Sequence, residues 1–244
     1  TVYSPFSATA LDIDLDGSLD LFIGFSYRKY GITPQQDRLY RNSGQGSFRD
    51  VTVENGIETY GGGEEEGTDH KHTWGVTVCD VNLDGWPDLL TSSYGRAYNM
   101  LWVHQGEEGY TDHSLTSGYA ADDNMDYSDN QFYACHCQVN PGPECSEVVP
   151  VSPLIACSAD YWNVGSDDQA WRNAGNTFTT LCADFDNDGD MDVYHADITH
   201  WHIGQSSDRS QLLVNTGETP IRFERPGLET TGLDRTHSGN DWNE

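Results

Sequence analysis

An acidic nine-residue pattern occurs three times in this chain of 244 residues. The copies align without gaps as D-x-[DN]-x-D-G-x-x-D, and they are DIDLDGSLD at 12–20, DVNLDGWPD at 80–88 and DFDNDGDMD at 184–192. A strand-like segment precedes each copy and another follows it. Farther along, each copy is followed by a strand, a glycine-containing turn and a second strand, at 38–48, 100–110 and 212–223. Two landmarks in the same order indicate an internal repeat, which restricts the chain to a repeat architecture.

Each repeat is predicted to form about four short strands, with the acidic loop between the first two. Units of this kind stack radially as the blades of a β-propeller. We therefore expect an all-β fold and a partial propeller, with repeats at about 1–72, 73–175 and 176–240. Because a ring usually needs at least about four blades, the chain is expected to be a segment of a longer propeller. Alternatively, the insertion described next or other chains complete the structure.

The second repeat carries an insertion at about 118–172, because the second and third loops lie much farther apart than the first and second. Four of the six cysteines fall in it: Cys135, Cys137, Cys145 and Cys157. Their spacing lacks the paired CxxC of a zinc ribbon, so disulfides in an oxidising compartment are favoured over a copper or zinc site that would include His136. The sequence does not choose among the possible pairings.

Cys79 and Cys182 lie one and two residues before their acidic loops. Side chains alternate between the faces of a strand, so these two are expected on opposite faces. Their positions therefore do not imply a bond between them. Each is predicted to be a buried thiol or to pair with the insertion.

The charge balance restricts the partners. Twelve Lys and Arg against 40 Asp and Glu give a net charge of −28, which argues against nucleic acid and anionic membrane surfaces. No run of about 18 apolar residues is present that could span a membrane. The acidic balance favours bound cations instead.

The loops are predicted to bind about three Ca²⁺ ions, because alternate side chains of a tight loop can converge on one hard cation and a glycine permits the turn. Without a cation, carboxylates this close repel one another and their pKa values rise. Metal-free acidic turns are the alternative. The predicted ligands are four side chains and one backbone carbonyl per loop: Asp12, Asp14, Asp16, Ser18 (carbonyl) and Asp20; Asp80, Asn82, Asp84, Trp86 (carbonyl) and Asp88; Asp184, Asp186, Asp188, Asp190 (carbonyl) and Asp192.

An EF-hand would place a glutamate at the twelfth loop position and a helix on each side. Here the twelfth position holds Ile23, Thr91 or His195, and the flanking segments are strand-like. The spacing is therefore EF-hand-like in a β setting.

The acidic loops and the element LYRNSGQGSFRDVT at 39–52 resemble FG-GAP/VCBS repeats, the calcium-binding blades of integrin α-subunit propellers. The resemblance is greatest to the cartilage acidic protein-like members, including bacterial ones, and it covers most of the chain except the insertion. It implies an extracellular propeller of about seven or eight blades with a Ca²⁺ ion in each loop. It also implies a use in adhesion, binding or scaffolding.

Two further constellations have competing interpretations. His195, His200 and His202, with His70 and His72, could form a transition-metal site, although ordinary surface histidines are favoured. Trp162 and Trp171 could form a platform for a sugar or a protein, although core packing is favoured.

The predicted function is a calcium-stabilised, secreted or cell-surface binding, adhesion or scaffold module. Its partner would be a protein or glycan ligand, recognised by the rim opposite the acidic loops or by the insertion. One alternative is a self-assembling subunit of an extracellular filament or surface layer. Another is a polysaccharide-active enzyme, which is not favoured because the G-x-S-x-G, H-E-x-x-H, P-loop and G-x-G-x-x-G motifs are missing.

Overall fold

The computed structural model describes residues 4–26, 35–59, 70–94, 97–158, 162–165, 167–170 and 176–233. The strands in these ranges form three four-stranded antiparallel sheets. The first sheet contains β1 (Pro5–Leu11), β2 (Asp20–Phe25), β3 (Arg38–Asn42) and β4 (Phe48–Asp50). The second contains β5 (His72–Cys79), β6 (Asp88–Tyr94), β7 (Met100–His104) and β8 (Tyr110–Asp112). The third contains β9 (Thr177–Ala183), β10 (Asp192–Asp197), β11 (Gln211–Asn215) and β12 (Phe223–Glu224).

Each sheet is a meander in chain order, which confirms the all-β expectation and the repeated unit. The acidic loop connects the first two strands of every sheet. The pairs that close the three loops are equivalent: Leu11 with Asp20, Cys79 with Asp88, and Ala183 with Asp192. The repeat read from the sequence is therefore a repeat of the backbone.

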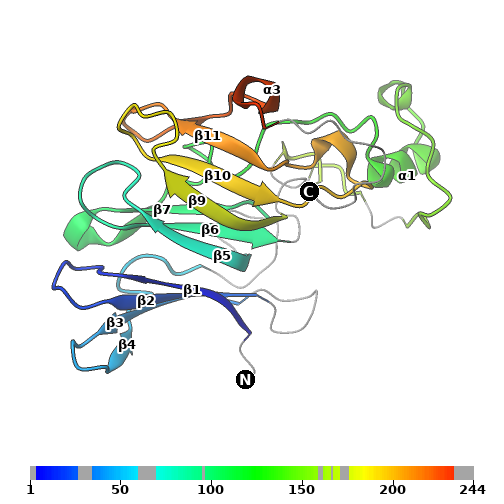
Figure 1. Ribbon diagram of the computed structural model, residues 1–244. Coiled ribbons are helices and arrows are strands. Elements are labelled where there is room, and N and C mark those ends of the chain that lie inside the picture. Colours follow the sequence, from blue (N-terminus) through cyan, green and yellow to red (C-terminus); the bar gives the residue numbers. More distant parts are fainter. Residues whose placement is uncertain are drawn as a thin grey trace.

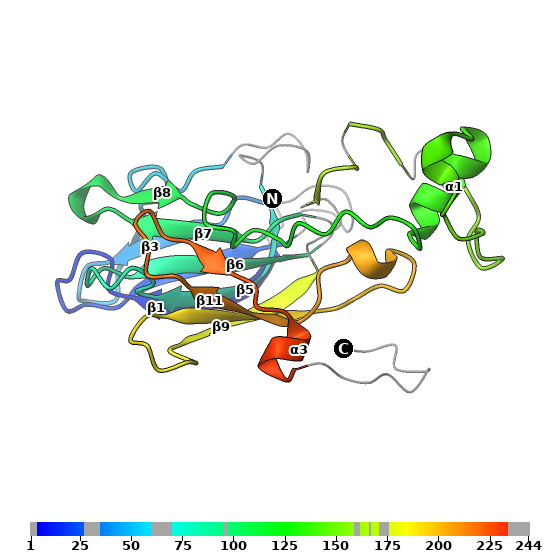
Figure 2. The same ribbon diagram turned by 90° about the horizontal axis from the view of Figure 1, so that it is seen from above.

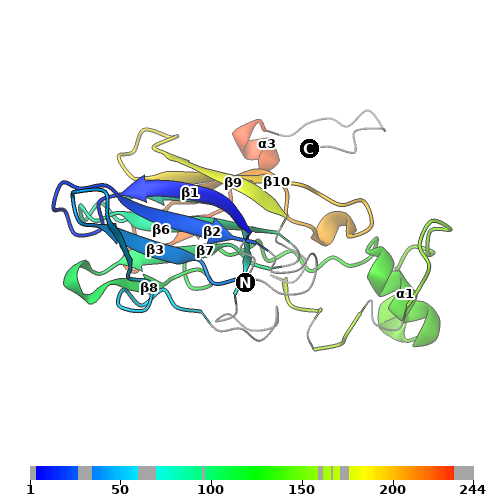
Figure 3. The same cartoon turned by 90° about the horizontal axis from the view of Figure 1, so that it is seen from below.

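The three sheets stack face to face, with the second between the first and the third (Figures 1 and 2). Their first strands, β1, β5 and β9, lie side by side along the stack (Figure 1), and β1 and β9 can also be seen on the same side of it in Figure 3. Side chains alternate between the two faces of a strand, so each face of the second sheet contributes side chains to a separate hydrophobic core. Leu89 belongs to the core shared with the first sheet, and its neighbour Leu90 belongs to the core shared with the third. The first and third sheets each keep one outward face, and the described sheets do not close a ring.

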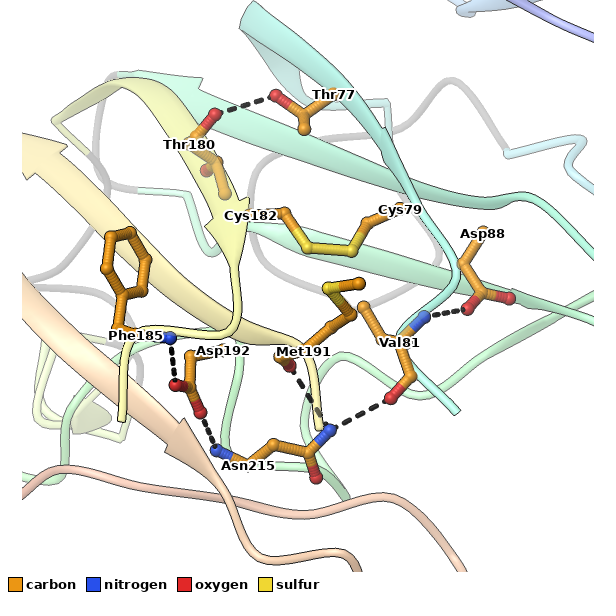
Figure 4. The surroundings of a disulfide bond; sticks show 10 residues. All are labelled: Thr77, Cys79, Val81, Asp88, Thr180, Cys182, Phe185, Met191, Asp192 and Asn215. Carbon is orange, nitrogen blue, oxygen red and sulfur yellow. Dashed lines mark hydrogen bonds between the residues drawn. A yellow bond between two sulfur atoms is a disulfide. The ribbon is translucent and has the colours of Figure 1, made fainter. Parts of the chain in front are cut away.

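The Cys79–Cys182 disulfide joins β5 to β9 and corrects the expectation from strand parity (Figure 4). The two Cα atoms are 6.3 Å apart. Opposite parity separates two side chains only when their strands lie in one sheet. When two such sheets stack, one face of the first packs against the other face of the second. Cys79 and Cys182, which are one and two residues before their loops, therefore point toward each other. Two residues earlier on the same strands, the Thr77 hydroxyl donates to the Thr180 carbonyl at 2.7 Å.

The insertion lies beside the stacked sheets and contains a helix that the sequence reading did not predict (Figures 1 and 2). Helix α1 (Gln131–Val139) begins after Asn130, whose side chain accepts hydrogen bonds from the Phe132 and Tyr133 amides at 2.9 and 3.1 Å. Asparagine at this position satisfies amides that have no partner within the helix. Short helical turns follow at η2 (Pro143–Cys145), η4 (Gly204–Ser206) and α3 (Leu228–Thr231), and η1 (Gly106–Glu108) lies within the hairpin of the second sheet.

Two disulfides within the insertion, Cys135–Cys157 and Cys137–Cys145, confirm the preference for disulfides over a cysteine metal site. Trp162 is buried against Tyr127 and Tyr133, with ring centroids 4.9 Å apart in both pairs. It is therefore a core residue of the insertion and not part of an exposed platform. Trp171 lies outside the described residues.

Candidate metal centre

The three acidic loops lie at one edge of the stack, each at the turn between the first two strands of its sheet (Figure 1). Their backbones are equivalent. The fourth residue of each loop has a positive φ, 55° at Leu15, 57° at Leu83 and 63° at Asn187. The glycine two residues later also has a positive φ, 87° at Gly17, 89° at Gly85 and 101° at Gly189. Glycine adopts this conformation without a steric penalty, which explains its place in the pattern.

The first aspartate of each loop folds the turn over itself. Its carboxylate accepts hydrogen bonds from amides four or five residues later. In the first loop, Asp12 accepts from the Asp16 and Gly17 amides at 3.1 and 2.8 Å. Asp80 accepts from Asp84 and Gly85 at 3.0 and 2.9 Å, and Asp184 accepts from Gly189 at 3.2 Å. These bonds hold the loop in a shape that directs its other carboxylates inward.

The side chain of the fifth residue of each loop accepts a hydrogen bond from the backbone amide of the seventh residue. Asp16 accepts from the Ser18 amide at 2.8 Å, Asp84 from Trp86 at 2.9 Å and Asp188 from Asp190 at 2.9 Å. The hydrogen bond from Ser18 lowers the pKa of Asp16. The seventh residue is the one whose carbonyl is predicted to bind the ion, and this hydrogen bond to its amide helps to hold that residue in the loop.

The seventh side chain also lies over the glycine of the later hairpin turn in the same sheet. A Cβ atom added to Gly44 would lie 3.1 Å from Ser18 Oγ, one on Gly106 would lie 3.7 Å from the Trp86 ring, and one on Gly217 would lie 2.6 Å from Asp190 Oδ2. The glycine-containing hairpin turn and the acidic loop, the two features shared by every repeat, are thus in contact. The hairpin turn supports the acidic loop from outside.

Carboxylate oxygens converge in the first and third loops. One oxygen from each of Asp12, Asp14 and Asp20 lies within 4.8 Å of the others, and the same is true of Asp184, Asp186 and Asp188. Asp14 Oδ1 and Asp184 Oδ1 are buried without a hydrogen-bond partner. Buried carboxylate oxygens are normally paired, and a bound cation would satisfy them. These donor sets fit a hard, oxygen-binding cation such as Ca²⁺.

The second loop has an amide where the others have a carboxylate. Asn82 accepts from the Asp84 amide at 3.2 Å and donates its Nδ2 hydrogen to Asp84 Oδ2 at 3.0 Å. An amide oxygen can also bind Ca²⁺, but it brings no charge. The second loop therefore offers the same positions with one fewer negative charge.

In the first loop a cationic side chain of the protein already lies against the carboxylates. Arg41 on β3 forms an ion pair with Asp14, and its Nη2 lies 3.7 Å from Asp16 Oδ2. The guanidinium is partly exposed, so it can move away from the loop. A cation in the first loop would compete with Arg41 for Asp14.

The last aspartate of each loop has a bracing role that the sequence reading missed. One oxygen of Asp20 accepts from the Ile13 amide at 2.9 Å, and the other accepts from Asn42 at 2.7 Å. Asp88 bonds the Val81 and His104 amides at 2.8 Å each, and Asp192 bonds those of Phe185 and Asn215 at 2.9 Å each. Each aspartate thus ties its loop to the third strand of its sheet, and the remaining lone pairs are left for a cation.

These bracing carboxyl groups are buried. Burial raises the pKa of Asp20 and raises that of Asp88 to about 7, against the hydrogen bonds that lower both. A bound divalent cation favours the ionised form of a neighbouring carboxylate. The loops are therefore placed to gain stability from a cation.

The last side chains of the third strands connect neighbouring sheets, and this connection was also missed. His104 Nε2 donates to the Ile13 carbonyl of the first sheet's loop at 3.0 Å. Asn215, at the equivalent place in the third sheet, donates to the Val81 carbonyl of the second sheet's loop at 2.8 Å (Figure 4). The two residues differ in type, so pattern matching along the sequence does not reveal their common role.

The histidine constellation does not form a metal site in the described residues. His195 is buried in β10, whereas His200 and His202 lie in the turn that follows, with ring centroids 5.1 Å apart. No candidate group of three metal ligands among the described residues includes a histidine. The expectation of ordinary surface histidines is wrong for His72 and His195, which are 0% and 1% exposed.

A cavity of about 300 Å³ opens beside the second and third loops. Its lining includes Val81, Val103, Asp190, Asn215 and Glu218. No sequence pattern indicated this cavity, because its walls come from two neighbouring sheets.

Residues 12–91 match the family model described as the FG-GAP-like repeat. The matched segment contains the first two acidic loops, and the third loop, outside it, has positive φ angles at the same positions and most of the equivalent hydrogen bonds. No curated protein matches the chain, so the likeness to cartilage acidic protein-like members stays a prediction.

Proposed function

We propose that this chain, which carries FG-GAP-like repeats, is a calcium-stabilised extracellular binding or scaffold module. FG-GAP repeats are extracellular-type binding modules, and the three sheets have the form of propeller blades. All six cysteines are paired in three disulfides, which fits an oxidising compartment. Among the described residues, no helix has the length and apolar character needed to cross a bilayer.

The observation that carries the calcium proposal is the convergence of Asp184, Asp186 and Asp188, with a buried, unpartnered oxygen on Asp184. In the first loop, Asp12, Asp14, Asp16 and Asp20 with the Ser18 carbonyl would hold an ion. In the second, Asp80, Asn82, Asp84 and Asp88 with the Trp86 carbonyl would do so. In the third, Asp192 and the Asp190 carbonyl would complete the set. Each ion would tie the first two strands of a blade together and stabilise the folded state.

The ligand-binding surface is proposed to be separate from these ions. The loops occupy one edge of the sheets, which leaves the opposite edge and the disulfide-linked insertion to contact a protein or glycan. The disulfides hold the shape of the insertion, which lowers the entropy lost on binding.

Ion counting by mass spectrometry under native conditions tests the calcium proposal. We expect about three Ca²⁺ ions per chain. Changing Asp184 and Asp188 together to Asn should remove one ion and lower the melting temperature in calcium. Asp190→Asn is the matched control, because only the backbone carbonyl of Asp190 is proposed to bind. Loss of the ion in the control, or an unchanged count in the double variant, would contradict this ligand assignment.

The binding role is tested separately, with immobilised matrix proteins and glycans probed in calcium and after EDTA. A calcium-stabilised module would be supported if EDTA abolishes both the binding and the increase in melting temperature that calcium produces. If the chain binds calcium but none of the immobilised proteins and glycans, the calcium sites remain supported. The proposed binding of those matrix components is then rejected.

A further inference from the structure

The cavity of about 300 Å³ beside the second and third loops lies where Asn215 donates to the Val81 carbonyl, at the joint between the second and third sheets. Both residues line the cavity, together with Val103 and Asp190. Its volume is at the lower end of the range for ligand pockets. The corresponding joint between the first and second sheets shows which side chains fill this place elsewhere in the chain.

Large ring side chains occupy the corresponding positions at the joint between the first and second sheets. Trp86 and Asp190 are both the seventh residue of their loops. His104 and Asn215 both end the third strand of their sheets. The Trp86 ring stacks on His104 with centroids 4.7 Å apart. The third sheet has a smaller side chain at each of these positions, which leaves space at the later joint.

A cationic side chain of the protein lies at the earlier joint. Arg41 is the fourth residue of β3 and is on the same face as Leu39, which packs in the core shared with the second sheet. Arg41 forms an ion pair with Asp14, the third residue of its own loop. At the later joint the equivalent residues are Val103 and Asn82, and both line the cavity. A guanidinium group therefore lies at one joint, and the equivalent place at the other joint is a cavity.

The walls of this cavity carry negative charge and an unused acceptor. Asp190 and Glu218 contribute two carboxylates, and none of the described residues that line the cavity is a lysine or an arginine. The Nδ1 atom of His113, another lining residue, is buried without a hydrogen-bond partner. In the tautomer whose Nε2 donates to Thr111 Oγ1, at 3.1 Å, this Nδ1 atom is an acceptor. Val51 is the equivalent residue of the first sheet, so the acceptor is particular to this cavity.

We propose that this cavity binds the guanidinium group of an arginine side chain from a partner protein. Val81, Val103 and Ile221 provide an apolar wall for the methylene stem of that side chain. The two carboxylates and His113 Nδ1 provide acceptors for the planar group, which has five N–H donors. The net charge of −28 attracts a basic partner before contact.

This site is separate from the proposed calcium sites and from the surfaces assigned above to the main ligand. Only the backbone carbonyl of Asp190 is proposed to bind the third ion, and Glu218 lies outside the acidic loops. Both carboxylates therefore keep their charge when the loops hold calcium. The cavity lies beside the loops, whereas the main ligand is assigned to the opposite edge and the insertion.

Two short peptides that differ in one charge test this proposal: acetyl-Gly-Arg-Gly-amide and the same peptide with citrulline, which has a similar shape and no charge. Titration calorimetry is carried out in saturating calcium, at pH 8 and at moderate salt to screen the net charge. The arginine peptide is expected to bind at one saturable site, and the citrulline peptide at least about tenfold more weakly. No saturable binding, or equal binding of the two peptides, overturns the proposal. Binding of free arginine without binding of the blocked peptide overturns the assignment to a partner protein.

Substitutions then locate the site. Asp190→Asn and Glu218→Gln should each weaken binding of the arginine peptide about threefold or more. Asp190→Trp supplies the residue of the second loop, and it should abolish binding because the ring fills the cavity. Glu107→Gln is the matched control, because Glu107 is the equivalent of Glu218 in the second sheet, is exposed and does not line the cavity. An equal loss in this control would show general attraction to an acidic surface and overturn the proposal.

The same variants separate this inference from the calcium proposal. Melting in calcium checks that each variant is folded, and native mass spectrometry counts its ions. Asp190→Asn is expected to lose peptide affinity with an unchanged ion count. Calcium binding without peptide binding rejects the arginine site alone, whereas peptide binding without calcium rejects the calcium proposal alone.

Discussion

His104 in the second sheet donates a hydrogen bond to the carbonyl of Ile13 in the acidic loop of the first sheet. Its other ring nitrogen accepts from the Gly106 amide at 2.9 Å, and its ring stacks on Trp86 with centroids 4.7 Å apart. One buried side chain thus connects two acidic loops and the hairpin turn beside them. The strength of this connection can be measured.

His104→Ala is expected to lower the free energy of unfolding by about 2–4 kcal/mol, because it leaves the buried Ile13 carbonyl and the partly buried Gly106 amide unpaired and removes a packed ring. His104→Asn should recover part of the loss, since Asn215 makes the equivalent bond with an amide. Urea unfolding in calcium measures both. Asn42→Ala is the matched control with a smaller expected cost, because the Asn42 side chain donates within its own repeat, to the Leu19 carbonyl. Equal costs for His104→Ala and Asn42→Ala would show that the link between sheets contributes nothing.

Removal of the Cys79–Cys182 disulfide by Ala substitutions is expected to cost about 2–4 kcal/mol in the free energy of unfolding. The bond spans 103 residues, so it restricts the unfolded chain far more than Cys137–Cys145, which spans 8. Replacement of Cys137 and Cys145 should therefore have the smaller effect. Reversible urea unfolding of the two double variants checks the order, and the reverse order would refute the chain-entropy explanation.

Arg41→Gln is expected to strengthen calcium binding at the first loop several-fold, because a competing positive charge leaves Asp14 and Asp16. Solvent screening of this exposed side chain keeps the effect modest. A calcium titration followed by native mass spectrometry measures the change, with the third loop as the internal reference. Weaker binding would mean that Arg41 instead holds the first loop in its binding shape.

His195 should make stability depend on pH. Burial, reinforced by the charge of Arg225, lowers its pKa to about 3 in the folded protein, compared with about 6.5 in an unfolded chain. The folded state then binds fewer protons, so the stability contribution is complete above about pH 6.5 and is lost as the pH falls towards 3. The slope is at most about 1.4 kcal/mol per pH unit.

His195→Gln should reduce this slope between about pH 6.5 and 5, while the Gln oxygen can replace Nδ1 as the acceptor for the Asn99 amide. Urea unfolding at several pH values measures the difference between the two proteins. Their difference at pH 8 gives the packing cost alone. Parallel pH profiles would show that His195 is not responsible.

The sequence predicted the elements of the fold because each is encoded locally. The turn at Gly17, Gly85 and Gly189 and the alternating strands beside it need only neighbouring residues. Helix α1 was missed although Asn130 is a recognisable capping residue, because the cysteine spacing dominated the interpretation of that segment. Strand parity did not imply the Cys79–Cys182 pair, since parity was applied without knowing whether the strands lie in one sheet or in stacked sheets.

The candidate site was predicted only in part for a related reason. Spacing identified which carboxylates share a loop, and it could not show which oxygens are already used by amides. Asp20, Asp88 and Asp192 belong to the pattern as potential ligands, yet each braces two backbone segments. Contacts between sheets, such as those of His104 and Asn215, depend on stacking that no local pattern contains.

The joint between neighbouring sheets has a backbone carbonyl as its acceptor, at Ile13 in one case and Val81 in the other. No side-chain substitution can delete that acceptor, and either an imidazole or an amide can serve as the donor. Repeats joined in this way can diverge freely in sequence and still fit one another. A gene duplication or exchange of one repeat would therefore preserve the joint from the outset, without matching changes in the neighbouring repeat.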